Sequence, residues 1–187
     1  MAATLLTLIY NGVADWEVGF PLFCLQPKIK SRFASAGHPL VRTSMGFETR
    51  VSLTDLGGVD VGEFDAIYLP GGMEPETGRF PRSLGENSEI LRLLQEFARG
   101  DKVIAAICGA PLVVGAAGLL KGRRFACDIA KDTRGWFEGA ERAEEPICAD
   151  GKILTASVSA IIPFCSELAR MLGEDETARD IKAFFIR

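Results

Sequence analysis

The sequence predicts an α/β fold, a three-layer sandwich in which a mostly parallel sheet carries helices on both faces, as in flavodoxin-like proteins. Short apolar runs with β-branched and aromatic residues alternate along the chain with segments of helical periodicity. The runs are apolar at consecutive positions, which is typical of strands buried on both faces. The chain of 187 residues is 48% hydrophobic and shows no repeat or linker, so we expect a single domain, 1–187.

Five apolar runs predict the strands of this sheet. Each is followed by residues that favour turns, such as Asn11-Gly12 after the first and Pro70-Gly71-Gly72 after the third. The predicted strands are Thr4–Tyr10, Ser31–Ser35, Ala66–Leu69, Val103–Ile107 and Lys152–Ala156.

Four segments between and after these strands predict helices. They are Trp16 to about Leu25 with Asp15 as its cap, Ser88 to Gly100 with Ser88 as its cap, Pro111–Ala117, and Ser159–Leu172. Trp16 and Phe20 are expected to pack in the core, with a pocket or a subunit contact as the alternative. The charged stretch Asp132–Asp150 predicts a surface excursion, where Trp136-Phe137 would form a lid or an interface.

The composition excludes several classes of protein. A net charge of −4 without a basic stripe argues against a nucleic-acid partner. No apolar stretch could span a bilayer and the first residues lack signal-peptide features, so we expect a cytoplasmic protein without a membrane partner. Five cysteines without a C-x-x-C pair predict neither a zinc site nor a disulfide framework. Without a phosphate-binding glycine motif, we expect no cofactor.

Cys108 stands where a buried strand runs into a helix. The stretch V-I-A-A-I-C-G-A-P places small residues on both sides of the cysteine and a proline suited to a first helical turn. Such small neighbours permit a sharp turn that projects the side chain at the carboxyl end of the sheet. The following helix N-terminus would lower the thiol pKa and favour the thiolate. The alternative is a small packed residue at a strand end.

Two further features are expected at the same edge of the sheet. Gly71 and Gly72 would let the backbone approach a ligand and present free N–H groups, although a simple loop is the alternative. Glu17, in the motif A-D-W-E-V-G-F, would face the thiol. A solvated glutamate that favours the helix dipole explains Glu17 equally well.

These residues together resemble the ThiJ/PfpI superfamily, which has the class I glutamine amidotransferase-like fold. The superfamily includes the Parkinsonism-associated protein deglycase and bacterial cysteine hydrolases and hydratases. The resemblance covers Leu5 to about Leu172. It implies that Cys108, on the sharp turn, is the nucleophile and that Glu17 is the acid that hydrogen-bonds its sulfur. It also implies that Gly72 and Gly109 supply the backbone N–H donors of an oxyanion pocket. It also implies a homodimer.

The sequence departs from the family pattern at the histidine. Many members carry one directly after the cysteine, where this chain has Gly109, and others about twenty residues later, where it has Cys127 and Asp128. The single histidine, His38, is expected to be an exposed turn residue. Asp128 would offer a second carboxyl near Glu17 and raise a carboxyl pKa, unless it is a solvated strand end.

We therefore predict a cysteine-dependent enzyme that acts on a small electrophilic molecule, as a hydrolase or amidase, a hydratase, or a glyoxalase-like enzyme. Cys108 would be the nucleophile and Glu17 the proton shuttle. A peptidase is disfavoured, because an amine leaving group needs a general acid, and imidazole is the best-matched group. The alternatives are a redox or stress-response protein in which Cys108 is oxidised, and a non-catalytic binding module.

Overall fold

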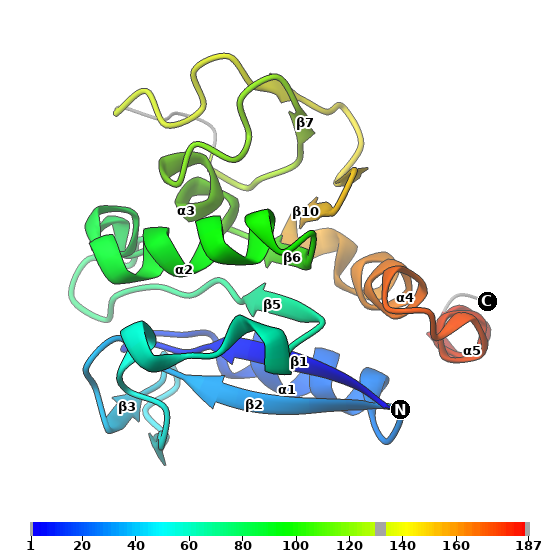
Figure 1. Ribbon diagram of the computed structural model, residues 1–187, viewed down its shortest axis with the longest axis horizontal. Helices are drawn as coiled ribbons and strands as arrows, with labels where there is room; N and C mark the ends of the chain where they lie inside the picture. Colours follow the sequence, from blue (N-terminus) through cyan, green and yellow to red (C-terminus); the bar gives the residue numbers. More distant parts are fainter. Residues whose placement is uncertain (1, 130–133, 186–187) are drawn as a thin grey trace.

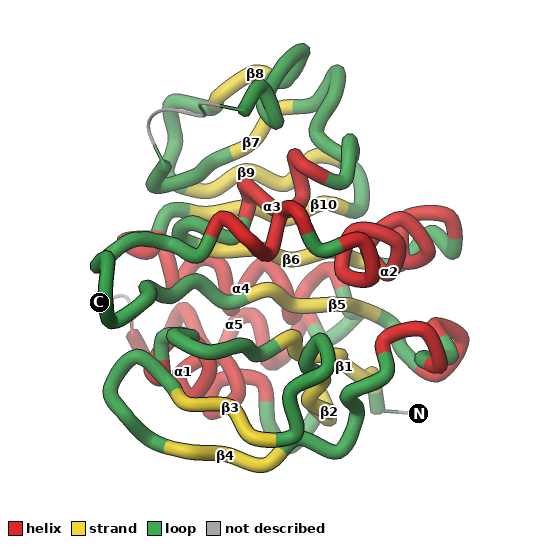
Figure 2. Tube along the Cα trace, turned by 90° about the vertical axis from the view of Figure 1, so that its left-hand side faces the viewer, coloured by secondary structure: helices red, strands yellow, loops and turns green. Residues whose placement is uncertain are grey.

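A computed structural model describes residues 2–129 and 134–185 and shows one mostly parallel sheet between two layers of helices (Figure 1). The sheet has the strand order β2-β1-β5-β6-β10-β9, and only β9 runs antiparallel to its neighbour. Figure 2 shows these strands one above another, from β9 and β10 down to β1 and β2. The strands are β1 Ala3–Leu8, β2 Ile29–Ala34, β5 Ala66–Leu69, β6 Val103–Ile107, β9 Ile147–Asp150 and β10 Ile153–Ala156. The expected fold class is confirmed.

Alternation along the strands divides the core into two layers. Side chains on one face of the sheet, such as Leu6, Ile67 and Ile104, pack against α2 (Ser88–Arg99) and α3 (Pro111–Ala116). Side chains on the opposite face, such as Leu5 and Tyr68, pack against α1 (Asp15–Leu25), α4 (Ile161–Met171) and α5 (Asp175–Phe185). Strands that are apolar on both faces therefore lie inside the sandwich, as their sequences predict.

Two predicted helix caps are wrong by one residue. Helix α1 begins at Asp15 itself, and the Asp15 carboxylate accepts hydrogen bonds from the Met45 N–H at 3.0 Å and the Ser44 hydroxyl at 3.4 Å. Helix α2 is capped by Asn87 rather than Ser88, since Asn87 Oδ1 accepts from the N–H groups of residues 89 and 90. The Asp15 side chain bonds to residues 44 and 45 instead of capping the helix, and Asn87 takes the capping position one residue before Ser88.

The expected core position is wrong for Trp16, whereas Phe20 packs against the edge of the core. Trp16 is 48% exposed and Phe23 59% exposed, while Phe20 is half-buried against Phe185, with ring centroids 5.1 Å apart. The buried face of α1 instead consists of Glu17, Pro21, Cys24 and Leu25. Two bulky apolar side chains of α1 thus remain on the surface.

Several short elements escape the sequence analysis. They are the hairpin β3 Leu40–Arg42 and β4 Glu48–Arg50, the pair β7 Arg124–Phe125 and β8 Glu141–Arg142, the edge strand β9, helix α5, and the 3-10 helices η1 Leu56–Gly58, η2 Val61–Glu63, η3 Arg82–Glu86 and η4 Val158–Ala160. The predicted excursion 132–150 lies partly outside the described residues. Its aromatic pair packs inward, because Trp136 lies against Gly85 and Phe137 stacks on Phe125 with centroids 4.4 Å apart.

In the parts of the chain that the structure describes, every helix falls short of the length and hydropathy that a membrane span requires.

Candidate active site

Cys108 occupies a strained turn at the carboxyl end of β6. Its φ of 61° lies in the left-handed region, which is uncommon for a residue other than glycine and is found at functional sites. The Cys108 N–H donates to the Ala156 carbonyl of β10 at 2.9 Å, and its carbonyl accepts from the Asp128 N–H at 3.0 Å and the Cys127 thiol at 3.3 Å. Three contacts from other segments therefore hold this turn. The thiol is half-buried, whereas the other four cysteines are buried.

Glu17 reaches the thiol from the first turn of α1. It is only 3% exposed, and its Oε2 accepts a hydrogen bond from the Gly71 N–H at 2.7 Å. The buried hydroxyl of Tyr68 donates to the Glu17 carbonyl at 2.6 Å and so fixes the start of the helix. Tyr68 lies on β5, which ends at the same edge of the sheet as β6. The solvated position considered for Glu17 is therefore wrong.

Gly71 lies between the thiol and the carboxyl. A Cβ atom at this position would lie 2.6 Å from Glu17 Oε2 and 2.9 Å from Cys108 Sγ, so these two atoms are at most about 5.5 Å apart. It would also lie 2.5 Å from the Cys108 Cβ. Only a residue without a side chain leaves room for both groups, which explains the glycine here.

Gly72 and Gly109 are packed as closely as Gly71. A Cβ on Gly72 would meet the Gly12 carbonyl oxygen at 2.3 Å, and one on Gly109 would meet the ring of Phe80 at 2.5 Å. Within residues 2–129 and 134–185, the Gly72 N–H has no hydrogen-bond acceptor, although the residue is buried. A buried N–H group without a partner is rare in native proteins and is available to a ligand.

Burial dominates the electrostatics of the pair. It raises the pKa of Glu17 to about 7, with a further contribution from the charge of Asp128, against hydrogen bonds from Gly71 and Cys108 that lower it. Burial and the charges of Glu17 and Asp128 raise the pKa of the Cys108 thiol above its ordinary value. The expectation of a lowered thiol pKa is therefore wrong, because two carboxylates and desolvation outweigh the donors of a six-residue helix.

Asp128 is exposed, follows β7 in the chain, and lies against the residues that follow β10. Its Oδ1 accepts from the Ser157 hydroxyl at 2.5 Å and its Oδ2 from the Val158 N–H at 2.8 Å. Arg142 holds the same loop from outside, since its guanidinium donates to the carbonyls of Cys127 at 2.6 Å and Ile129 at 2.5 Å. These hydrogen bonds hold the exposed Asp128 carboxylate in place.

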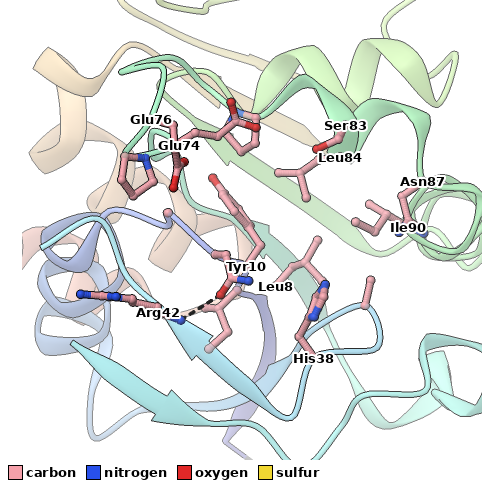
Figure 3. Close-up of a pocket in the computed structure, with 16 residues that line it drawn as sticks. Leu8, Tyr10, His38, Arg42, Glu74, Glu76, Ser83, Leu84, Asn87 and Ile90 are labelled. Atoms are coloured by element: carbon pink, nitrogen blue, oxygen red, sulfur yellow. Dashed lines mark hydrogen bonds between the residues drawn. The ribbon is translucent and has the colours of Figure 1, made fainter. Parts of the chain in front are cut away.

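His38 lines a cavity whose lining does not include Cys108. It is exposed, as expected, and lines a cavity of about 590 Å³ at the carboxyl end of β1 (Figure 3). Leu8, Tyr10 and Ile90 line the same cavity, and Cys108 does not. The Tyr10 ring stands edge-on to Phe80, with centroids 6.2 Å apart, and Phe80 in turn covers Gly109.

The positioning residues Tyr68, Phe80 and Arg142 were missed by the sequence analysis. Each acts through a contact over 15 or more positions of sequence, as in the Arg142 bond to Cys127, and carries no local motif. Among the described residues, no group of three or more histidine, cysteine or acidic side chains is arranged to hold a metal ion.

Comparisons with known proteins identify the family and the fold of this chain. A protein of Archaeoglobus fulgidus is 28% identical over 89% of this chain and 96% of its own length. A deglycase of Thermococcus kodakarensis is 29% identical over 78% of this chain and 84% of its own length. The crystal structure of Drosophila melanogaster DJ-1beta has a TM-score of 0.83 and 22% identity, and the match covers 100% of this chain and 98% of that one. Residues 3–171 match the DJ-1/PfpI family, to which this chain therefore belongs.

Proposed function

We propose that this protein is a cysteine-dependent enzyme for small electrophilic substrates, with Cys108 as nucleophile and Glu17 as proton shuttle. The observation that carries the proposal is the thiol and the buried carboxyl on either side of Gly71, at most about 5.5 Å apart. Relatives named deglycases, from Thermococcus kodakarensis and Pyrococcus furiosus, support an enzyme. An ordinary packed cysteine needs neither a left-handed turn nor a buried acid beside it.

The proposed first step is addition of the thiol to a carbonyl carbon. The Cys108 sulfur forms a bond to carbon, its proton passes to the ionised Glu17 carboxylate, and the carbonyl π electrons move to oxygen. The N–H groups of Gly72 and Gly109 would stabilise that oxyanion. Glu17 then returns the proton to the oxygen, which completes a hemithioacetal in the case of an aldehyde. A pKa of about 7 suits Glu17 to both transfers near neutral pH.

The single histidine separates the possible reactions. His38 lines a cavity whose lining does not include Cys108, and we therefore assign no imidazole to the leaving group at Cys108. Hydration or rearrangement of a carbonyl compound requires no amine to leave, and an activated amide or ester provides a better leaving group than a peptide. We therefore favour glyoxalase-like, hydratase or activated-amide chemistry over peptidase activity.

The test uses turnover of a small α-oxoaldehyde such as methylglyoxal. We expect turnover by the wild-type protein, loss of at least about a hundredfold in Cys108→Ser, and a comparable loss in Glu17→Gln. The control is Glu89→Gln, an exposed change on α2. Cys108→Ser protein that turned over the aldehyde at the wild-type rate would contradict the proposal.

The second candidate is a redox function of the same thiol. Cys108 is the one cysteine of the five that is not buried, and a solved relative, DJ-1 of Toxoplasma gondii, is described as oxidized. Peroxide would convert the Cys108 thiol to a sulfenic acid with release of water. Mass spectrometry after peroxide treatment tests this, because Cys108 should gain oxygen before the other four. Absence of turnover together with selective oxidation would favour this candidate, and absence of both would favour a binding module.

We also propose a homodimer that covers the exposed side chains of α1. Trp16 and Phe23 on α1 are accompanied by exposed Met45 and Phe47 of the β3–β4 turn. Asp15 binds this turn to α1, so the two segments form one surface. Sedimentation velocity should show a dimer for the wild type and a monomer for the Trp16→Glu, Phe23→Glu double variant. A wild-type monomer at all concentrations would refute it.

The free thiols of the buried cysteines suit the proposed cytoplasmic location.

A further inference from the structure

We infer that Asp128 is a specificity-determining residue, which makes the Cys108 site select uncharged or cationic electrophiles over anionic ones. The inference rests on the proposed role of Cys108 as nucleophile, and it adds the charge class of the substrate. It comes from the place of Asp128 in the fold, from the bonds that fix it, and from the charges around it.

The position of Asp128 follows from the ends of two adjacent strands. Cys108 follows β6, and the Asp128 carboxylate binds Ser157 and Val158, which follow the neighbouring strand β10. The Asp128 N–H also donates to the carbonyl of Cys108 at 3.0 Å. The carboxylate therefore stands beside the reactive turn, and because the residue is exposed, it faces any molecule that enters from solvent.

The bonds around Asp128 prevent it from turning away. Both carboxylate oxygens accept hydrogen bonds, and the Arg142 guanidinium donates to the backbone carbonyls of the residues on either side of Asp128. The guanidinium is stacked over Phe125, 5.0 Å from the ring centroid, and over Phe137 at 5.7 Å. The Arg142 guanidinium thus contacts backbone carbonyls and aromatic rings.

In the described part of the chain, the Asp128 carboxylate accepts hydrogen bonds from two uncharged groups, the Ser157 hydroxyl and the Val158 N–H. Within the residues that the structure describes, Asp128 forms no ion pair. The charged side chains that raise the pKa of Cys108 are Glu17 and Asp128, both acidic. A neutral electrophile meets no Coulomb barrier here, while an anionic one approaches the exposed carboxylate of Asp128, whose repulsion is strongest at low salt.

Two alkylating reagents of nearly equal shape isolate this effect. Iodoacetamide is neutral and iodoacetate is anionic, and in both the thiolate forms an S–C bond as iodide leaves. The fraction of thiolate is the same for both reagents, so the ratio of their rate constants is independent of the thiol pKa. The rate constants are measured for Cys108 itself, by mass spectrometry of its peptide at fixed pH and low salt.

The variant is Asp128→Asn, which keeps an oxygen to accept from Ser157 or Val158. The matched control is Asp180→Asn, an exposed change of the same charge on α5, a helix that adds nothing to the site. We expect the ratio of the iodoacetamide rate to the iodoacetate rate to fall by about fivefold or more in Asp128→Asn and to stay unchanged in Asp180→Asn.

A measurement on the wild type serves if the variant does not fold. The ratio of the iodoacetamide rate to the iodoacetate rate at Cys108 should fall toward that of a free thiol as salt rises to about 0.5 M. Salt screens the exposed charge of Asp128 and so weakens its repulsion of iodoacetate. An unchanged ratio in Asp128→Asn, or a wild-type ratio insensitive to salt, would overturn the inference while Cys108 still reacted. A Cys108 that reacted with neither reagent would instead overturn the proposed function, and this inference with it.

Discussion

Replacement of Gly71 by alanine should damage both stability and the site. The new Cβ would lie 2.5 Å from the Cys108 Cβ and 2.6 Å from Glu17 Oε2, closer than such atoms approach in folded proteins. The backbone of Gly71 lies outside the left-handed region, so the penalty is one of space alone. Overpacking of this kind lowers the free energy of unfolding by about 1–3 kcal/mol. To relieve it, the carboxyl of Glu17 must move away from the thiol.

Urea denaturation and the pH profile of Cys108 alkylation measure the two effects. We expect Gly71→Ala to unfold at lower urea, and the apparent pKa of Cys108 to move toward the free-thiol value of about 8.5. The matched control is Gly19→Ala on α1, where a Cβ meets nothing within 4 Å. It should stabilise the helix by about 0.5–1 kcal/mol and leave the profile unchanged. A Gly71→Ala protein with wild-type stability and a wild-type profile would refute the packing argument.

Three other changes test the electrostatics, the caps and the core. The pKa of Glu17 is about 7 in the folded protein against an ordinary 4.5. The contribution of Glu17 to the free energy of unfolding is therefore greatest below pH 4.5 and is lost as the pH rises through 7. Glu17→Gln should therefore raise the free energy of unfolding by about 3 kcal/mol at pH 8 and by little at pH 4.5 in paired urea titrations; an equal gain at both pH values would contradict this. Asn87→Ala should lower the free energy of unfolding by about 1 kcal/mol, and Ser88→Ala by much less, in the same assay; the reverse order would restore Ser88 as the cap. Phe164→Ala, at a fully buried residue beside Tyr68, should lower it by about 3–5 kcal/mol, and a loss below about 1 kcal/mol would mean that the site is not close-packed.

The central strands were the most predictable part of the fold. The predicted strands Ala66–Leu69 and Val103–Ile107 coincide with β5 and β6, because strands buried on both faces are marked by apolar runs. The predicted helix Ser159–Leu172 divides into η4 and α4. The edge strand β9 was not predicted, since its four residues, I-C-A-D, gain their structure from pairing with β10.

The geometry of the candidate site was also partly predictable, but its electrostatics were not. The local motif around Cys108 predicted a sharp turn, and the structure gives that residue a positive φ. The direction of its pKa shift depends on how deeply the thiol is buried and on Glu17 and Asp128, which reach it from distant segments. The aromatic residues of α1 show the same limit, because helical spacing does not reveal which face is covered.

The hydrogen bond from the Cys108 N–H to Ala156 makes the turn at Cys108 depend on a strand that is synthesised later. The acceptor lies 48 residues later in the sequence, on the last parallel strand of the sheet. Until β10 has been synthesised and has docked beside β6, the cysteine lacks the partner that holds its left-handed backbone. A nascent chain that ends before this strand therefore lacks the hydrogen bond that fixes the turn, and the proposed nucleophile takes its final geometry only when the fold is almost complete.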